Sequence, residues 1–296
     1  MPLINIRGVD HYYEWIPKSA KSQDKSVMVF IHGWGGSARY WESTANALSD
    51  TFDCLLYDLR GFGRSKLPQD PLELLYEMED YAEDLAVLLD ALELDRVYIH
   101  AHSLGASAAT LFLNRYPERV EQVILTCTGI FEYEEKSFTA FHKIGGYVVK
   151  FRPRWFLKIP FAGVFFMARF LHRPLPAAVS RAFLEDYLEA DYQAALGTML
   201  TAVSKYAAEV MPQEFARVSV PTLLISGQYD KIIPAALGRR AAELNERVEY
   251  FEIPGTAHFP MLEKPEIYLE RVREFLAASS SNSSSGIEGD SINLVT

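Results

Sequence analysis

Residues 97–106 read Val97-Tyr98-Ile99-His100-Ala101-His102-Ser103-Leu104-Gly105-Ala106, and this stretch decides the fold that the sequence predicts. An apolar strand runs into a turn of small residues with a serine at its tip, and an alanine-rich helix follows at once. Ala101 and Gly105 stand two residues before and after Ser103, where a tight strand–turn–helix tolerates only small side chains. Such a turn pushes a serine hydroxyl out of the backbone, so we expect Ser103 to be the centre of the chain's chemistry.

Length and composition predict a globular protein with a sizeable core. The chain has 296 residues, of which 49% are hydrophobic and 23% charged. Its net charge of −10 argues against a nucleic-acid binder, because phosphate contact requires a basic surface. Cys54 and Cys127 lie in apolar, strand-like runs and match no metal-ligand spacing. We therefore expect both to be buried reduced thiols.

The sequence also carries an expectation about location. The amino terminus lacks the basic start and long apolar core of a secretory signal. No stretch reaches the roughly 20 apolar residues that span a bilayer. We therefore expect a cytoplasmic protein.

Apolar strands alternate with helical stretches along most of the chain. Strands are expected over residues 27–32, 54–57, 97–101, 120–126, 222–226 and 248–253, and helices over 39–49, 77–92, 234–244 and 264–277 as well as after Ser103. Because each strand is almost wholly apolar, this pattern predicts an α/β fold whose doubly wound, mostly parallel sheet is covered on both faces. In such sheets the working residues gather at the carboxyl ends of the strands. The residues expected just there are Gly33, Asp58, Ser103 and Asp230.

Two segments depart from this alternation. Residues 131–215 are helix-like and aromatic-rich, and they hold eleven of the 18 phenylalanines. We interpret them as an inserted helical cap, or lid, that divides the core into residues 1–130 and 216–278. Residues 279–296 are dominated by Ser, Asn and Gly, which predicts a disordered tail.

A serine nucleophile needs a base, and His258 is the strongest candidate among the seven histidines. A strand-like run over 249–253 and a turn over 254–257 would place it at the same edge of the sheet as Ser103. His100 is expected to be a buried strand residue. His102 is next to Ser103 in sequence, so its side chain is expected to leave the turn in another direction.

The base in turn needs a carboxylate that fixes its tautomer and stabilises the imidazolium. Asp230 follows the strand over 222–226 and is the expected acid; it could also be a turn residue that caps the next helix. Glu132, after the strand over 120–126, is the alternative acid.

The oxyanion that forms when Ser103 attacks a carbonyl needs hydrogen-bond donors. The backbone N–H of Leu104 at the helix start and that of Trp34 in the loop His32-Gly33-Trp34-Gly35-Gly36 are the candidates. Each such donor typically stabilises the transition state by about 3–4 kcal/mol.

Four motifs in register resemble those of the α/β-hydrolase fold family, and together they extend over residues 1 to about 278. They are the glycine loop over 32–36, Asp58-Leu59-Arg60-Gly61-Phe62-Gly63-Arg64-Ser65, Ala101-His102-Ser103-Leu104-Gly105, and Gly227-Gln228-Tyr229-Asp230 with Gly255-Thr256-Ala257-His258. The resemblance implies that Ser103 is the nucleophile, His258 the base and Asp230 its partner acid. It also implies that the backbone N–H groups of Trp34 and Leu104 form the oxyanion hole and that residues 131–215 form a cap over the site.

The motifs depart from the family pattern at one position, since Ala101 stands where glycine is usual. Alanine adds only one methyl group, so catalysis is not put in doubt. Asp58 is expected to be structural and to hold its turn. Because the nucleophile position carries Ser103 and not an aspartate, the family's epoxide hydrolases and haloalkane dehalogenases are disfavoured.

The cap carries a charge pattern of its own. Residues 136–181 contain nine Lys or Arg and no Asp or Glu, interleaved with aromatic side chains. Basic residues beside an aromatic, apolar surface suit a segment that lies in a membrane interface. We therefore expect peripheral contact with an anionic membrane; the alternative is that the aromatics line the pocket and pack the cap while the basic residues are solvated.

The predicted function is that of a serine hydrolase that cleaves a carboxylic ester with a large apolar acyl or alcohol part. Ser103 would form an acyl-enzyme and His258 would activate water to release the acid. No metal or organic cofactor is required. The alternatives on the same triad are a carbon–carbon bond hydrolase, a thioesterase or an acyltransferase, and an alternative of another class is a ligand-binding receptor on this fold.

Overall fold

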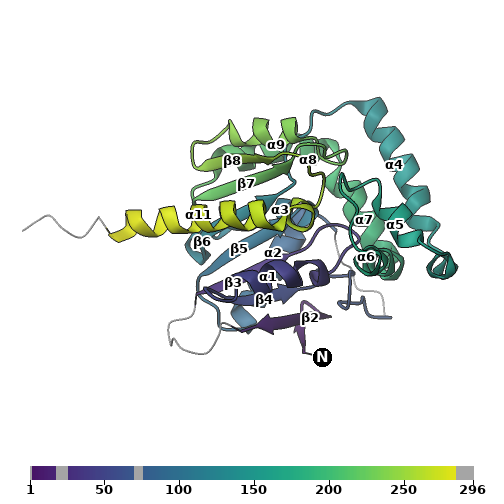
Figure 1. The fold of residues 1–296 in the computed structure, drawn as a ribbon, viewed down its shortest axis with the longest axis horizontal. Helices are drawn as coiled ribbons and strands as arrows, with labels where there is room; N and C mark the ends of the chain where they lie inside the picture. Colours follow the sequence, from purple (N-terminus) through teal and green to yellow (C-terminus); the bar gives the residue numbers. More distant parts are fainter. Residues whose placement is uncertain (1, 18–25, 70–75, 285–296) are drawn as a thin grey trace, which may run out of the picture.

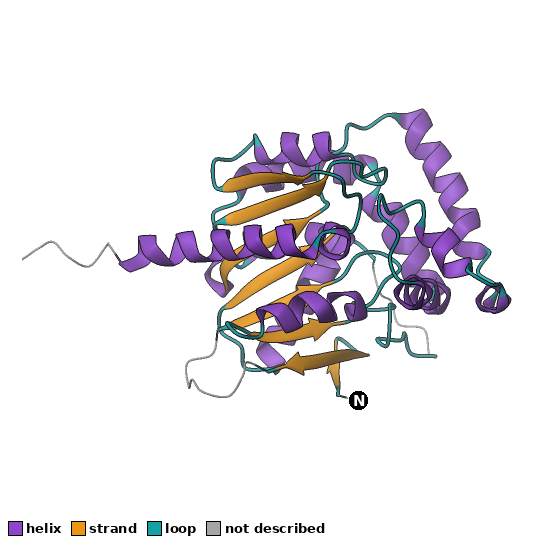
Figure 2. Ribbon diagram, viewed as in Figure 1, coloured by secondary structure: helices purple, strands orange, loops and turns teal. Residues whose placement is uncertain are grey.

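One eight-stranded sheet organises the chain in a computed structural model that describes residues 2–17, 26–69 and 76–284 (Figure 2). The strand order is β1-β2-β4-β3-β5-β6-β7-β8. The strands are β1 (Leu3–Ile6), β2 (Val9–Ile16), β3 (Val27–Ile31), β4 (Asp53–Tyr57), β5 (Val97–His102), β6 (Val120–Thr126), β7 (Thr222–Gly227) and β8 (Val248–Ile253). From β4 to β8 all neighbours pair in parallel, which confirms the predicted fold class.

An antiparallel hairpin extends one edge of the sheet and was not among the expected elements. Its strands are β1 and β2, and β2 pairs antiparallel with β4. The turn between them consists of Arg7 (φ 50) and Gly8 (φ 85), both in the left-handed region. This two-residue turn has the backbone twist that suits a right-twisted hairpin.

The strands are continuous apolar runs because helices cover the sheet on both sides. Alternate residues of β3 enter different cores: Met28 and Phe30 pack on one face, Val29 and Ile31 on the other. Helices α1 (Glu42–Leu48) and α11 (Pro265–Ser284) cover the first face, and α11 crosses it in front of the strands in Figure 1. The second face is covered by α2 (Met78–Ala91), α3 (Leu104–Arg115), α8 (Lys205–Arg217) and α9 (Ala235–Ala242). The short helices are η1 (Ala38–Trp41), η2 (Pro117–Arg119) and α10 (Pro260–Glu263).

A helical cap is inserted between β6 and β7 at the carboxyl-end edge of the sheet (Figure 1). It contains α4 (Glu135–Lys150), η3 (Arg154–Lys158), α5 (Ala162–Met167), α6 (Ala177–Glu189) and α7 (Tyr192–Ala202). The insertion predicted over residues 131–215 ends inside α8, which packs on α3 and α9 of the core. Phe215 of α8 is fully buried in the core cluster, so α8 is a core helix by its contacts.

The carboxyl-terminal helix is longer than the sequence predicted. The disordered tail was expected to begin at residue 279, whereas α11 continues to Ser284. Once a helix is nucleated by packed residues such as Tyr268 and Val272, each added turn costs little, and serine is only a mildly unfavourable helix residue. Residues 285–296 of the predicted tail lie outside the described residues.

Two further observations concern the expectations from composition. Cys54 and Cys127 are both buried free thiols, as predicted. Among the described helices, none is both long enough and apolar enough to cross a membrane.

Candidate active site

Ser103 lies at the tip of a tight turn between β5 and α3. Its backbone takes φ 52 and ψ −121, a conformation that non-glycine residues rarely adopt and that a strained nucleophile turn requires. The turn leaves no room for side chains beside it, since a Cβ on Gly105 would lie 2.4 Å from the carbonyl oxygen of His32. Ala101 is fully buried, so its extra methyl group is accommodated in the core.

Three side chains from three strand ends form one hydrogen-bond chain. The Ser103 Oγ lies 3.1 Å from Nε2 of His258, and the Nδ1 of His258 lies 2.7 Å from Oδ2 of Asp230. Asp230 is buried, and its other oxygen accepts hydrogen bonds from the backbone N–H groups of Ile232 (2.7 Å) and Ile233 (3.1 Å). Asp230 therefore both orients His258 and caps the turn before α9.

The alternative acid lies elsewhere. Glu132 is exposed and pairs with Arg240 on α9, with 2.7 Å between Oε1 and Nη2. His258 already has Asp230 on its Nδ1, so the structure gives Glu132 no contact with the base.

The two expected oxyanion donors flank Ser103. Leu104 is the first residue of α3, where backbone N–H groups have no partner within the helix. Trp34 lies in the loop after β3 that lines the cavity, and its indole N–H donates to the carbonyl of Ala195 on α7 at 2.9 Å. The preceding Gly33 brings this loop against the turn of Ser103: an added Cβ there would lie 3.0 Å from the Cβ of Ser103.

Asp58 holds its turn, as expected. Its carboxylate accepts from the backbone N–H of Ala38 (2.7 Å) and from the backbone and guanidinium of Arg64 (2.8 and 2.7 Å). Burial opposes ionisation of Asp58, but Arg64 and the other donors lower its pKa below the usual value. Asp58 is thus an ionised structural residue that joins the β4 turn to the start of η1.

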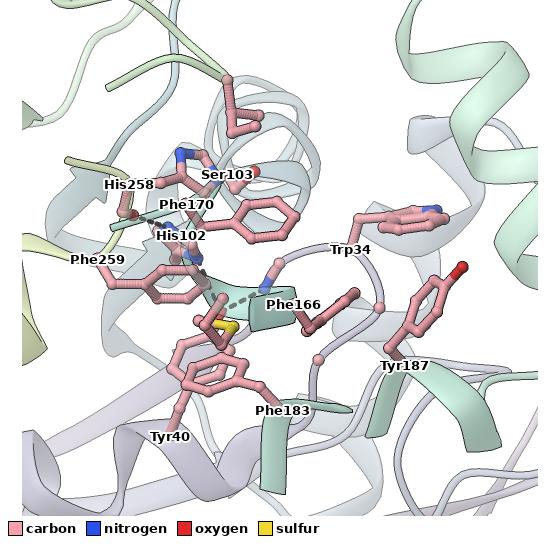
Figure 3. Close-up of a pocket in the computed structure, with 15 residues that line it drawn as sticks. Trp34, Tyr40, His102, Ser103, Phe166, Phe170, Phe183, Tyr187, His258 and Phe259 are labelled. Carbon is pink, nitrogen blue, oxygen red and sulfur yellow. Dashed lines mark hydrogen bonds between the residues drawn. The ribbon is translucent and has the colours of Figure 1, made fainter. Parts of the chain in front are cut away.

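The sequence did not reveal a buried hydrogen-bond network around His102, next to His258 (Figure 3). The Nε2 of His102 lies 2.8 Å from the backbone carbonyl oxygen of His258. Because a carbonyl oxygen can only accept a hydrogen bond, Nε2 of His102 carries the proton. Nδ1 then accepts from the hydroxyl of Tyr40 at 2.9 Å, and the Tyr40 oxygen accepts from the N–H of Gly33 at 2.5 Å. Burial and the neighbouring His258 lower the pKa of His102 far below its usual value, which keeps it neutral.

A second set of hydrogen bonds connects His258 to the cap. The N–H of His258 donates to the carbonyl of Phe170 at 2.9 Å. Glu263, nearly fully buried, accepts from the N–H groups of Ala257 (2.8 Å), His172 (2.7 Å) and Arg173 (2.8 Å). The loop that carries His258 and the loop that leaves α5 are thus held by one carboxylate.

A partly open, mostly aromatic cavity of about 90 Å³ adjoins Ser103 and His258 (Figure 3). The cap contributes Phe166, Met167, Phe170, Phe183 and Tyr187 to its wall, and the core contributes Trp34, Tyr40, Ile232 and Phe259. Part of the cap's aromatic content therefore lines the pocket, as one of the two sequence interpretations expects.

Possible metal ligands come together at the same place. Within the described part of the chain, the atoms of His102, Cys127 and His258 lie within 4.8 Å of one another. The ring nitrogens of both histidines already bond to protein groups, and burial raises the pKa of the Cys127 thiol well above its usual value. A metal ion binds thiolate and a free nitrogen lone pair, which a protonated thiol and ring nitrogens already engaged in hydrogen bonds do not offer.

Comparison with known proteins agrees with this architecture. The bacterial 2-(acetamidomethylene)succinate hydrolase of Mesorhizobium japonicum is 26% identical over 262 residues, which cover 85% of this chain and 88% of that protein. The bifunctional esterase/perhydrolase of Acinetobacter calcoaceticus is 24% identical and covers 85% and 90% of the two chains. A thermophilic esterase from Thermogutta terrifontis has a solved structure that matches with a TM-score of 0.75 at 21% identity, over 94% of this chain and 99% of that chain. The sequence profile described as "alpha/beta hydrolase fold" matches residues 26–265, so the chain belongs to the alpha/beta hydrolase fold family.

Proposed function

We propose that this protein is a serine hydrolase that cleaves a carboxylic ester with an apolar acyl or alcohol part. The observation that carries the proposal is the hydrogen-bond chain from Ser103 through His258 to Asp230, with 3.1 and 2.7 Å between the bonded atoms. A nucleophile within reach of a base, which is itself oriented by a buried acid, is the arrangement that activates a hydroxyl group. The names of relatives that include a hydrolase and an esterase support the same class.

In the first half-reaction, the Ser103 oxygen attacks the ester carbonyl while Nε2 of His258 takes the hydroxyl proton. The N–H groups of Trp34 and Leu104 donate to the oxyanion, and Asp230 stabilises the imidazolium through Nδ1. Collapse of the tetrahedral intermediate breaks the carbonyl–alkoxy bond, and the imidazolium gives its proton to the leaving alcohol. The acyl group stays on Ser103.

In the second half-reaction, His258 takes a proton from water, which attacks the acyl-enzyme. The new tetrahedral intermediate collapses, the Ser103 oxygen recovers a proton from the imidazolium, and the carboxylic acid leaves. No metal ion or organic cofactor enters either step.

The wall of the cavity supports the choice of an apolar substrate. Aromatic and aliphatic side chains surround the space beside Ser103 and offer it few polar partners. A cavity of about 90 Å³ holds only a short group, since cavities that admit benzene measure roughly 150 Å³. A larger acyl or alcohol part would extend through the open side of this cavity or displace cap side chains such as Phe166 and Phe170.

The test is covalent labelling with a fluorophosphonate together with turnover of esters of increasing acyl length. We expect the wild type to label at Ser103 and the Ser103→Ala variant to lose both labelling and about a millionfold in kcat. The matched control is Ser49→Ala, which removes an exposed hydroxyl at the end of α1 and leaves both readouts unchanged.

Other outcomes distinguish the alternative functions. Absence of labelling in the folded wild type would mean that Ser103 is not activated, and the hydrolase proposal would be wrong. Saturable ligand binding that survives Ser103→Ala, with negligible wild-type turnover, would identify a receptor. If the protein is labelled but acts only on thioesters, on carbon–carbon bonds or in acyl transfer to an alcohol, the proposed triad would stand and the proposed ester substrate would be wrong.

A further inference from the structure

The cap presents a large apolar surface to solvent. Nine of its bulky side chains are between 43% and 74% exposed, and we call them the cap face: Phe141, Ile144, Tyr147, Val148, Phe151, Trp155, Ile159, Phe161 and Phe165. Phe161 and Phe165 are the extremes, at 70% and 74%. So many exposed apolar side chains within one segment indicate an interaction site.

Helix α4 shows that this exposure is organised. Phe141, Ile144, Val148 and Phe151 recur at i, i+3, i+7 and i+10 and so share one side of the helix. Phe138 and Val149 on the other side are buried against the rest of the protein. The rest of the protein therefore covers the inner side of α4, whereas the outer row stays exposed to solvent, with Phe151 packed against Phe156 of η3 at its end.

A row of lysines runs beside the apolar row. Lys136, Lys143 and Lys150 follow a seven-residue spacing, which keeps them in one line along α4, and all three are exposed. The whole segment 136–181 has nine basic and no acidic residues, although the chain as a whole carries −10. Within the described residues, acidic partners are found for two of the nine, Arg154 with Glu189 and Arg181 with Glu185.

We propose that the cap face binds the surface of an anionic lipid bilayer. Aromatic and aliphatic side chains would enter the interface while the lysine row meets the lipid headgroups. Charge favours this occupant over a second copy of the chain, because two cap faces would bring like charges together. α4 lies on the side of the molecule opposite the carboxyl end of α11 in Figure 1, so the core does not obstruct a flat surface there.

Helix α5 connects the cap face with the cavity. Phe161 and Phe165 point to solvent, whereas Phe166 and Met167 line the space beside Ser103. A second hollow of about 360 Å³ opens between η3, α5 and α6, with Ile159, Phe161 and Leu184 among its lining residues and Arg181 at the same hollow. An apolar hollow of this kind suits an acyl chain.

Because α5 contacts both the cap face and the cavity, binding to the bilayer would affect which substrates reach Ser103. This part of the inference rests on the proposed function. Insertion of Phe161 and Phe165 would draw α5 away from the cavity and make room for a lipid-borne ester. The binding of the bilayer itself does not depend on catalysis.

Vesicle flotation tests the binding. The inactive Ser103→Ala protein is mixed at low salt with phosphatidylcholine vesicles, either pure or containing phosphatidylglycerol. We expect binding to the anionic vesicles that falls as salt is added. The Lys143→Gln/Lys150→Gln variant should bind about thirtyfold more weakly, which corresponds to about 2 kcal/mol at 1.4 kcal/mol per decade.

Matched controls separate this surface from general charge and hydrophobicity. Arg96→Gln/Arg247→Gln removes the same charge at the amino ends of β5 and β8, opposite the cap, and should bind like the parent. Phe161→Ser/Phe165→Ser should lose binding, whereas Leu3→Ser/Leu244→Ser, at exposed positions of the core, should not. All eight substituted side chains are exposed, so folding should survive, and circular dichroism checks it.

Failure of the proposal and failure of the hydrolase function look different. The bilayer proposal would be wrong, whatever the activity, if the protein did not bind anionic vesicles or if the control variants lost as much binding. It would also be wrong if the protein formed a concentration-dependent dimer that Phe161→Ser/Phe165→Ser dissociates. With Ser103 restored, we expect Phe165→Ser, which lines neither hollow, to hydrolyse a short soluble ester at the parent rate and a vesicle-embedded ester at least tenfold more slowly.

Discussion

At the scale of single residues, Tyr40 and His102 connect parts of the site that the chain keeps far apart. The Tyr40 hydroxyl bonds to His102 of the nucleophile turn and to the N–H of Gly33, next to the expected oxyanion donor Trp34. His102 in turn donates to the backbone of His258. Since His102 is buried and neutral, the network adds no charge beside the base and acts by position alone.

Removal of the Tyr40 hydroxyl should therefore reduce kcat more than it changes KM. In Tyr40→Phe the buried Gly33 N–H loses its acceptor, which should cost about 1–3 kcal/mol of stability. Because the loop then holds Trp34 less firmly, we expect kcat for a short ester to fall about tenfold. Urea unfolding and steady-state kinetics measure the two effects.

Tyr268→Phe is the matched control. Tyr268 of α11 is also fully buried, and its hydroxyl forms hydrogen bonds with His100 (2.6 Å) and Thr126 (2.5 Å) of the sheet. It should lose similar stability at unchanged kcat. Equal kcat losses in the two variants would show that Tyr40 has a structural role only.

At the scale of elements, two glycines show what the site and the cap require of their helices. Gly105 opens α3 against β3, where a Cβ would lie 2.4 Å from a backbone oxygen that cannot swing away. Gly146 lies inside α4, and a Cβ there would meet nothing within 4 Å. The first glycine permits a close approach, whereas the second only weakens its helix.

The same substitution should consequently have opposite effects at the two positions. Gly105→Ala must push α3 off β3 and displace Ser103, so we expect loss of fluorophosphonate labelling and a lower Tm. Gly146→Ala should stabilise α4 by up to about 1 kcal/mol and slow its amide hydrogen exchange, with labelling unchanged. Normal labelling of Gly105→Ala would refute the packing argument for the nucleophile turn.

At the scale of the whole molecule, buried histidines make the fold sensitive to acid. Burial lowers the pKa of His100 from 6.5 to about 3, and burial together with the charge of Arg60 does the same for His11. Burial also lowers the pKa of His32 and His102. The pKa of Asp84 shifts in the opposite direction, since burial raises it from 3.8 to about 6.

The sign of the pH dependence follows from proton uptake. Below pH 6.5 the unfolded chain protonates its histidines while the folded protein keeps them neutral. Their contribution to stability is thus complete above pH 6.5 and declines toward about pH 3, by roughly 1.4 kcal/mol per pH unit for each histidine. Asp84 takes up a proton in the folded state below about pH 6 and in the unfolded state only below about pH 3.8. Between these pH values its proton uptake offsets the loss of stability caused by one histidine.

We therefore expect the free energy of unfolding to fall by about 2 kcal/mol or more between pH 7.5 and pH 5.0. Urea titrations at the two pH values measure the change, and an unchanged slope shows that the same surface unfolds. His100→Phe should reduce the difference because one buried titrating group is gone. Stability that is flat or rises toward pH 5.0 would contradict the neutral state of these histidines.

Features that depend on neighbouring residues could be predicted from the sequence. The run of small residues around Ser103 fixes a sharp turn by local sterics, and apolar runs of strand length that alternate with helical periodicity specify a covered parallel sheet. The order of Ser103, Asp230 and His258 at strand ends then follows, because parallel strands present their carboxyl ends at one edge. The turn Arg7-Gly8 is just as local, yet no strand was assigned around it.

Contacts between distant segments were decided only by the tertiary structure. Tyr40 meets His102 across 62 positions, and Phe170 meets His258 through a backbone bond that no side-chain pattern encodes. Composition predicted a basic, aromatic cap but could not separate Phe166, which faces the cavity, from Phe165, which faces solvent. Local sterics and periodicity fix each element, whereas the partner of a side chain depends on how complete elements pack, and that is settled only when the whole chain has folded.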